Sequence, residues 1–247
     1  MLSFFSRITF ILIAIACSAL AGQPHLSTTT PEPQGAIWLN RHEAKLIEAR
    51  TKTQPDMVLI GDSITQALEA NSALTSRIFP GKTILNLGFS ADRTENVLWR
   101  LQNGALDGLD PKLIMILIGT NNTGLRKDPP QITAKAIGLI VDMVRMKCPN
   151  SKILLLSILP REESPEGPLR KLNAQVNELL PALADNQHVF HEDLNAALLD
   201  AQGRLPANIM PDFLHPSPAG QEIWMEALKP VVERLLGSET PAVPDAS

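Results

Sequence analysis

Cysteine is scarce in this chain, which has only two in 247 residues. Cys17 lies in an apolar run near the N-terminus that we expect to be removed, which leaves Cys148 without an intramolecular partner. Because no internal disulfide can then form, the fold must be stable through packing alone. Cys148 lies in the stretch MVRMKCPN, at the end of a predicted amphipathic helix and before a proline, a position typical of a structural thiol rather than a nucleophile.

Clusters of basic residues are also missing. The formal net charge is −4 at pH 7, and Lys and Arg are spread along the chain. This argues against nucleic acid as the partner and leaves small molecules or neutral polymers. No set of His, Cys and Asp has the spacing of metal ligands, so we expect no metal. The apolar run at residues 8–20 is shorter than the roughly 20 residues of a membrane span, so we expect no stable span.

The N-terminus has the layout of a secretory signal peptide. Arg7 precedes the apolar run and the small-residue sequence Ala19-Leu20-Ala21 follows it. This pattern predicts cleavage after Ala21 and a secreted or periplasmic protein. Lipid attachment at Cys17 is an alternative.

The remaining chain reads as one large domain with two irregular ends. The ends are rich in Pro and Thr and have no apolar period. The predicted organisation is a signal peptide at residues 1–21, a flexible tether at 22–36, a single domain at 37–237 and a disordered tail at 238–247.

Within the domain, short apolar runs alternate with longer amphipathic stretches. Runs with the length and composition of strands buried on both faces occupy residues 57–61, 83–88, 113–119, 152–159 and 188–193. Helical spacing occupies residues 38–52, 63–77, 92–104, 130–147, 168–184 and 218–236. This alternation predicts an α/β fold in which helices cover both faces of a five-stranded parallel sheet, a three-layer α/β/α sandwich.

Three predicted strands end in a glycine that polar residues follow. Because ligands of open parallel sheets bind beyond the carboxyl ends of the strands, the turns after Gly61, Gly88 and Gly119 should share one edge. The first turn carries Ser63, whose hydroxyl is placed as a nucleophile would be. A lone G-D-S is more often only a helix cap, since Ser and Asp satisfy the first free N–H groups of a helix. The serine therefore needs a base before it indicates catalysis.

Four of the five histidines do not suit the role of that base. His25 lies in the predicted tether, and His42 lies on a helix face that we expect to be solvated. His188 and His191 belong to the fifth predicted strand, where an odd spacing puts them on opposite faces and argues against a shared metal.

His215 is the remaining candidate. Pro216 disfavours helical geometry at His215, so the imidazole lies on a loop. Asp212, three residues earlier, can turn back to hydrogen-bond the ring and select its tautomer. Alone, D-x-x-H is weak, because Asp212 could simply close an Asx-turn.

Attack on an ester also needs donors for the developing oxyanion. The backbone N–H groups of Ser63 and Gly88 and the side-chain amide of Asn121 would converge at the strand ends. For Gly88 and Asn121 the alternative is a role in the turns only. The joint occurrence of all these parts favours an active site.

Four sequence blocks carry a family resemblance: G-D-S at 61–63, the glycine of N-L-G at 88, G-T-N at 119–121 and D-x-x-H at 212–215. With these blocks in this order, the chain resembles the SGNH hydrolases, also called GDSL esterases and lipases. It looks most like the branch of the platelet-activating-factor acetylhydrolase catalytic subunits and their bacterial relatives. The stretches that suggest this branch are PDMVLIGDSIT, NLGFSADRTENVLWRLQNG, IGTNN, LPREESPEGPLRKLN and MPDFLH.

The resemblance implies a role for each catalytic candidate. Ser63 would be the nucleophile, His215 the general base and Asp212 the residue that orients it. Gly88 and Asn121 would complete the oxyanion hole with Ser63. The fold would be flavodoxin-like, with no metal or organic cofactor. One departure is Ala91, which stands where a glycine often follows the oxyanion turn.

The resemblance also suggests a substrate class. Ile64, Thr120 and Leu214 adjoin catalytic residues and would wall the acyl site, where branched side chains leave room only for acetyl or other short acyl groups. The expected substrate is a small-molecule or glycan ester, and a homodimer is also expected. The alternatives are an acyltransferase with the same triad and a binding module without catalysis.

Four further residues have structural interpretations. Asp92 with Glu95 three positions on predicts a helix N-cap. Trp99 falls on the apolar side of the same helix and is expected in the core. Arg161 and Arg170 bracket a Pro-rich loop and are expected at the rim or in ion pairs.

Overall fold

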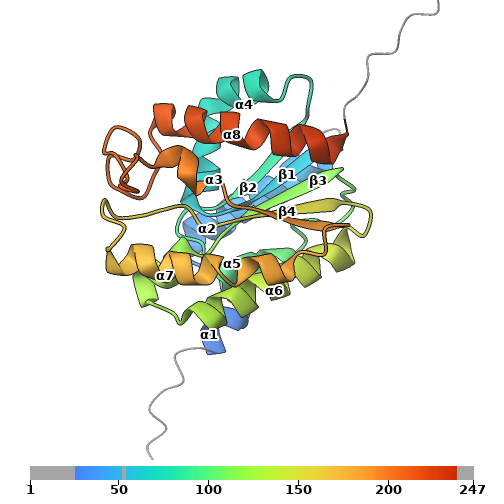
Figure 1. The fold of residues 1–247 in the computed structure, drawn as a ribbon. Helices are drawn as coiled ribbons and strands as arrows, with labels where there is room; N and C mark the ends of the chain where they lie inside the picture. Colours follow the sequence, from blue (N-terminus) through green and yellow to red (C-terminus); the bar gives the residue numbers. More distant parts are fainter. Residues whose placement is uncertain (1–25, 52–53, 238–247) are drawn as a thin grey trace, which may run out of the picture.

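A computed structural model describes residues 26–51 and 54–237 of the chain (Figure 1). The predicted signal peptide at residues 1–21, which includes Cys17, lies outside the described residues, as does the predicted tail at 238–247. The same holds for residues 22–25 of the predicted tether, which include His25.

The centre of the molecule is a five-stranded, all-parallel sheet with the strand order β2-β1-β3-β4-β5. The strands are β1 (Met57–Gly61), β2 (Ile84–Gly88), β3 (Leu113–Leu117), β4 (Lys152–Leu156) and β5 (Val189–Glu192). Gly61 lies level with Gly88 on one neighbour and with Leu117 on the other. The polar turns after these strands therefore share one edge, and the predicted fold class is confirmed.

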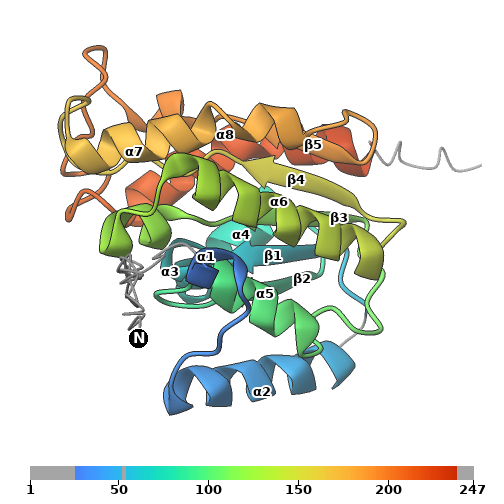
Figure 2. The same cartoon turned by 90° about the horizontal axis from the view of Figure 1, so that it is seen from below.

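Alternate residues of the strands enter two separate cores, one on each face of the sheet. Val58 and Ile60 pack on one side against α5 (Thr94–Gln102), α6 (Pro130–Lys147) and α7 (Pro168–Asn177). Met57 and Leu59 pack on the other side against α3 (Ser63–Ala67), α4 (Ser72–Ile78) and α8 (Pro218–Leu236). Figure 1 shows these two helical layers below and above the sheet, and Figure 2 shows α2 along the β2 edge. The result is the three-layer sandwich that the alternating pattern predicted.

The helix ends follow local sequence signals. Helices α6, α7 and α8 begin at prolines 130, 168 and 218, where the missing N–H costs nothing. The predicted helix at 63–77 is divided by a 3₁₀ turn, Leu68–Asn71, into α3 and α4. The α-helices are α1 (Leu26–Thr29), α2 (Ala36–Thr51), α3 (Ser63–Ala67), α4 (Ser72–Ile78), α5 (Thr94–Gln102), α6 (Pro130–Lys147), α7 (Pro168–Asn177) and α8 (Pro218–Leu236).

Part of the segment predicted as a tether is packed against the domain. Thr28 is fully buried, and its hydroxyl donates a 2.9 Å hydrogen bond to Oδ2 of Asp128. Arg126 donates to Oγ of Ser27 and forms ion pairs with Asp128 and Glu95. Polar contacts to residues about a hundred positions away thus hold Ser27 and Thr28 against the domain, which composition alone does not reveal.

His42 also departs from its predicted solvated face. It is buried, it stacks on Trp38 with ring centroids 6.0 Å apart, and its Nε2 lies 3.0 Å from the carbonyl oxygen of Asn103. Burial lowers the pKa of His42. Trp99, half-buried rather than in the core, packs against Trp38 at 5.3 Å.

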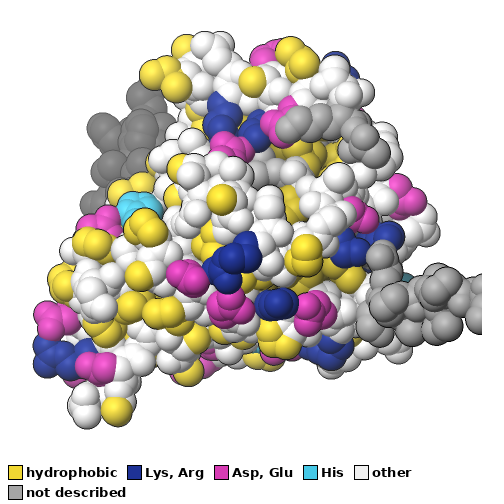
Figure 3. Space-filling model, turned by 90° about the horizontal axis from the view of Figure 1, so that it is seen from above, with side chains coloured by type: hydrophobic (Ala, Val, Ile, Leu, Met, Phe, Trp, Pro, Cys, Tyr) yellow, Lys and Arg dark blue, Asp and Glu magenta, His cyan; other side chains and the backbone are white. Residues whose placement is uncertain are grey.

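The sequence predicted neither a basic patch on the surface nor a stable membrane span. Acidic and basic side chains are interspersed on the face shown in Figure 3, so no basic patch gathers there. Across residues 26–51 and 54–237, no helix combines the length and apolarity that crossing a membrane requires.

Candidate active site

The sequence left open whether Ser63 is a helix cap or a nucleophile, and in the structure the cap of α3 is Asp62. Oδ1 of Asp62 accepts a 3.0 Å hydrogen bond from the N–H of Ile64, so Asp62 caps α3. The hydroxyl of Ser63 is free of that task. Gly61 before them is required by space, because a Cβ there would lie 2.0 Å from Oγ1 of Thr65.

The hydroxyl of Ser63 is paired with the predicted base instead. Its Oγ lies 2.9 Å from Nε2 of His215, and Nδ1 of His215 lies 2.6 Å from Oδ2 of Asp212. The other oxygen of Asp212 accepts the N–H groups of His215 and Leu214, so the Asx-turn and the ring contact coexist. Burial alone would raise the pKa of Asp212, but the hydrogen bonds from His215 and the backbone lower it. Asp212 is thereby held as a carboxylate.

The loop that carries His215 is fixed from outside. Phe213 has a left-handed φ of 54°, and its carbonyl oxygen accepts a 2.9 Å hydrogen bond from the N–H of Glu162. The carboxylate of Glu162 also accepts the N–H groups of Leu169 and Arg170 at the start of α7. The catalytic loop is therefore tied to a helix on the other side of the sheet.

Gly88 does not present its N–H to the site. That N–H donates a 2.8 Å hydrogen bond to Oδ1 of Asn86, which differs from the predicted oxyanion role. The glycine is required for close approach, since a Cβ at Gly88 would lie 2.3 Å from the backbone nitrogen of Gln66. Sequence spacing could not reveal that Asn86, two residues earlier, occupies this donor.

Ala91 lies three residues after Gly88, in the turn that follows β2. Its φ of 61° is left-handed, and among the described residues its N–H has no hydrogen-bond acceptor; the same holds for the N–H of Ser63. The sequence signal was the glycine that relatives often have at this position. Asn121 is buried beside this turn, and its Nδ2 donates to the carbonyl oxygen of Asp92 at 2.9 Å. An amide nitrogen carries two hydrogens, so one remains for a ligand.

Asp92, predicted as a helix cap, is instead half of a buried ion pair. Its carboxylate accepts both Nε and Nη2 of Arg100, at 2.9 and 2.7 Å, together with Nε1 of Trp38 at 2.6 Å. Arg93 occupies the cap position. The guanidinium of Arg100 lies 4.0 Å from the ring centroid of Phe89. Burial raises the pKa of Asp92 and lowers that of Arg100, so desolvation is the dominant influence on both groups.

The three residues predicted to wall the acyl site lie at the catalytic edge. Ile64 and Thr120 are buried, and Leu214 is half-buried beside His215. Nη1 of Arg161 donates a 3.0 Å hydrogen bond to the carbonyl oxygen of Thr120. Arg161 therefore supports the site rather than the rim.

Arg170 is buried rather than at the rim, and it donates to the carbonyl oxygens of Arg161 and Gly203. Cys148 is fully buried, as a structural thiol should be.

Asp62 has an unusual protonation equilibrium beside the nucleophile. Burial, followed by repulsion from Asp92, raises its pKa to about 7, although the N–H of Ile64 and the nearby His215 act in the opposite direction. This carboxyl is thus set to titrate near neutral pH.

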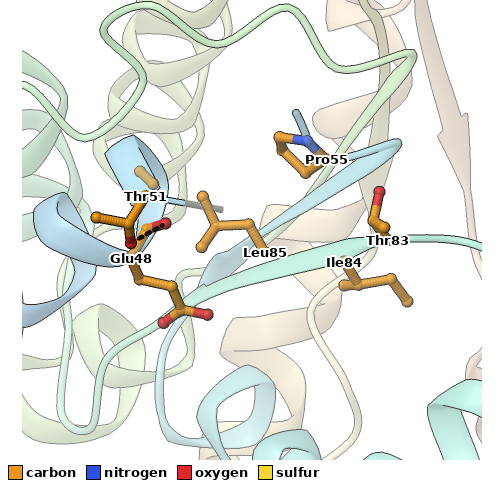
Figure 4. A pocket seen from close by; sticks show the side chains of 7 residues that line it. Glu48, Thr51, Pro55, Thr83, Ile84 and Leu85 are labelled. Carbon is orange, nitrogen blue, oxygen red and sulfur yellow. Dashed lines mark hydrogen bonds between the residues drawn. The ribbon is translucent and has the colours of Figure 1, made fainter. Parts of the chain in front are cut away.

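Within residues 26–51 and 54–237, no three His, Cys, Asp or Glu side chains are grouped to hold a metal ion. A pocket of about 400 Å³ lies at the opposite edge of the sheet, where Pro55 precedes β1 and Ile84 begins β2 (Figure 4). No residue of the Ser63, His215 and Asp212 set lines it.

Known proteins match this arrangement in sequence and structure. The model of the GDSL-like lipase/acylhydrolase family matches residues 59–223. The alpha2 subunit of platelet-activating factor acetylhydrolase IB from Rattus norvegicus is 34% identical over 208 residues, 83% of this chain and 86% of the relative. The human alpha1 subunit is 34% identical over 203 residues, 82% of this chain and 85% of the relative.

Solved structures of other proteins share this fold. One described as a platelet activating factor from Streptococcus pneumonia aligns with a TM-score of 0.63 and 27% identity, over 78% of this chain and 94% of that one. An acetylxylan esterase from Geobacillus stearothermophilus aligns with a TM-score of 0.59 and 19% identity, over 75% and 95% of the two chains, which shows a common fold.

The fold, the hydrogen-bonded Ser-His-Asp set and these matches together define a carboxylic ester hydrolase. The chain belongs to the GDSL-like lipase/acylhydrolase family, as the four sequence blocks predicted.

Proposed function

We propose that this protein is an exported serine esterase that removes acetyl or other short acyl groups from glycan or small-molecule esters. The observation that carries the proposal is the continuous contact from Ser63 Oγ through His215 to Asp212, at 2.9 and 2.6 Å. Such a chain is what a serine requires to become a nucleophile.

In the first half of the reaction, Oγ of Ser63 attacks the ester carbonyl carbon while Nε2 of His215 accepts its proton. The negative charge on the carbonyl oxygen is met by the N–H groups of Ser63 and Ala91 and by Nδ2 of Asn121. When the carbon–oxygen bond to the alcohol breaks, His215 returns the proton to the leaving oxygen. Asp212 holds the ring and stabilises its charged form.

In the second half, water replaces the alcohol. His215 removes a proton from the water as it attacks the acyl carbon, and then protonates Oγ of Ser63 as the acid leaves. The same acyl-enzyme would pass its acyl group to a sugar hydroxyl if one replaced the water. Hydrolysis and transfer are therefore distinguished by product analysis, not by the triad.

The proposed short-acyl preference follows from the positions of Ile64, Thr120 and Leu214, which adjoin the proposed catalytic residues in sequence. The names of two matched proteins refer to acetyl esters: one is an acetylhydrolase and the other an acetylxylan esterase. Both names suit a small acyl site with different alcohols.

The test is a substrate screen with purified protein and its Ser63→Ala variant. Activity on p-nitrophenyl esters should be highest for acetate and fall as the acyl chain lengthens, and acetylated oligosaccharides should release acetic acid. Recovery of the acetyl group on a sugar acceptor instead would favour the transferase. Hydrolysis that survives Ser63→Ala would overturn the proposal.

Export and assembly need separate measurements. Export by a signal peptide predicts a mature N-terminus at residue 22, found by N-terminal sequencing of the secreted or periplasmic protein; a lipid on Cys17 would contradict this cleavage site. Light scattering tests the expected homodimer.

A further inference from the structure

A groove of about 360 Å³ lies beside the catalytic centre, between the start of α2 and the turn after β2. This volume falls within the range of about 300–1,000 Å³ typical of small-molecule sites. Neither the triad nor the predicted acyl wall accounts for it. The residues that line it are Gln34, Gly35, Ala36, Ile37, Trp38, Arg41, Gln66 and Ser90.

Two of these residues connect the groove to the reacting atoms. Gln66 lies three positions after Ser63 on α3, so the two side chains are neighbours on one face of that helix. Oε1 of Gln66 accepts a 2.7 Å hydrogen bond from the N–H of Ser90, the residue before Ala91. The groove is thus lined by a helical neighbour of the proposed nucleophile and by the residue that precedes Ala91.

The groove lies on a different side of Ser63 from the acyl wall. Ser90 follows β2, whereas Thr120 follows β3, and β1 with Ser63 at its end lies between these two strands. Leu214 lies on the loop of His215. If Thr120 and Leu214 confine the acyl group, the larger part of the ester extends toward β2.

One wall of the groove is apolar. It includes Ile37, whose side chain is 88% exposed, and Trp38, whose ring is fixed by its hydrogen bond to Asp92. An exposed branched side chain is suited to the C–H face of a ring-shaped ligand.

The other wall is polar but has no unbalanced charge. Nε2 of Gln66, Oε1 of Gln34 and Oγ of Ser90 have no hydrogen-bond partner among the residues that the structure describes. Arg41, the charged lining residue, donates to the carbonyl oxygen of Gly88 and pairs with Glu69 at 3.0 Å. Free neutral donors and acceptors in a groove that also has apolar lining residues match a neutral sugar, which has hydroxyl groups at its edge and C–H groups on its faces.

From this juxtaposition we propose that the groove between Ile37 and Ser90 binds the sugar residue that carries the ester, as the alcohol component of the substrate. The inference rests on the proposed esterase function and specifies its alcohol side. The sugar hydroxyls contact Gln66, Ser90 and Gln34, while its C–H face lies against Ile37.

The experiment compares two acetate esters that differ only in their alcohol, acetylated xylo-oligosaccharide and ethyl acetate. In Gly35→Phe a new side chain narrows the groove without a clash, since nothing lies within 4 Å of a Cβ at Gly35. Ile37→Ala with Ser90→Ala removes one contact from each wall. Both changes should lower the ratio of kcat/KM for the oligosaccharide to that for ethyl acetate about tenfold or more, mainly through KM. Ile47→Ala, an exposed position on the same helix outside the groove, is the matched control and should keep the wild-type ratio.

Two outcomes overturn the groove proposal. One is an unchanged ratio in both variants. The other is an unchanged oligosaccharide rate combined with slower hydrolysis of decyl acetate, which would assign the groove to an alkyl chain.

Failure of the proposed function gives a different result, because wild-type protein would then hydrolyse neither ester. In that case calorimetric titration of xylo-oligosaccharide into Ser63→Ala, with and without Gly35→Phe, still decides the groove. Binding that Gly35→Phe weakens supports the groove, and binding that it leaves unchanged, or no binding, refutes it.

Discussion

The buried ion pair of Asp92 and Arg100 gives the most direct test of how the fold holds the turn after β2 in place. The side chains are 0% and 1% exposed. Arg100→Met removes the cation and leaves the carboxylate with Trp38 and Gln34 as donors. Removing one partner of a buried ion pair costs about 3–5 kcal/mol of unfolding free energy. Each kcal/mol shifts the Tm of a domain of this size by about 2–4 °C, so we expect a loss of roughly 6–20 °C.

The double variant separates the charge from the packing. In Asp92→Asn with Arg100→Met no charge is left, and the amide oxygen introduced at position 92 can still accept the indole N–H of Trp38. The double variant should therefore be more stable than the sum of the two single changes implies, with a coupling of about 2 kcal/mol, within the range for contacting residues. Urea unfolding followed by circular dichroism measures all three variants.

Activity provides a second measurement, because the carbonyl oxygen of Asp92 accepts the side-chain amide of Asn121. Arg100→Met should lower kcat with little change in KM at temperatures where the variant stays folded, by less than the 10²- to 10³-fold of a lost oxyanion donor. If Arg100→Met lowers the free energy of unfolding by less than about 1 kcal/mol, as an exposed substitution or a lost cap does, then the ion pair does not stabilise the fold as a buried pair should.

Four further predictions concern single residues. Ser63→Ala should lower kcat about 10⁶-fold and abolish labelling by an organophosphate; retained labelling would assign the nucleophile elsewhere. Asp212→Asn should lower kcat about 10⁴-fold through the wrong tautomer of His215, so a normal rate would remove Asp212 from the triad. Asn121→Ala should lower kcat about 10²- to 10³-fold with KM nearly constant, and an unchanged kcat would leave Asn121 a turn residue. Burial raises the pKa of Asp62 from 3.8 to about 7, so the folded state binds the Asp62 proton more tightly than the unfolded chain does. Protonated Asp62 therefore adds to the free energy of unfolding; the contribution is full below about pH 4 and is lost as the pH rises to about 7. Asp62→Asn should lack that decline in unfolding free energy, and parallel pH profiles for variant and wild type would contradict the assignment.

The sheet could be predicted closely because its signals are local. A strand buried on both faces needs a continuous apolar run, and β1 and β3 have one over every residue. Proline at the first helical position marked α6, α7 and α8 in the same way. The parallel order then placed Ser63 and Asn121 at one edge without knowledge of any side-chain contact.

Side-chain partners distant in sequence were beyond such signals. Composition suggested a tether where Thr28 is buried against Asp128. A charged helix face suggested a solvated His42, yet Trp38 and Asn103 enclose it. In both cases a polar residue is buried because its partner lies elsewhere in the chain, and hydrophobic periodicity carries no information about that partner.

In the turn after β2, the glycine of the family motif and the residue with an open N–H are different residues. Gly88 matches the family block, but its N–H is taken by Asn86, and the open N–H belongs to Ala91, at a left-handed φ that costs a residue with a Cβ about 1–3 kcal/mol. Such a conformation persists only where the surroundings impose it.

Three separate elements impose it here. Gln66 of α3 accepts the N–H of Ser90, Asn121 after β3 donates to the carbonyl oxygen of Asp92, and Arg100 of α5 holds the Asp92 carboxylate. The turn is thus fixed at both of its ends and from beneath, before any substrate arrives. An oxyanion hole gains its effect from donors that need not reorganise. If this turn forms the proposed oxyanion hole, the buried ion pair of Asp92 and Arg100, which is costly to desolvate, keeps those donors in place.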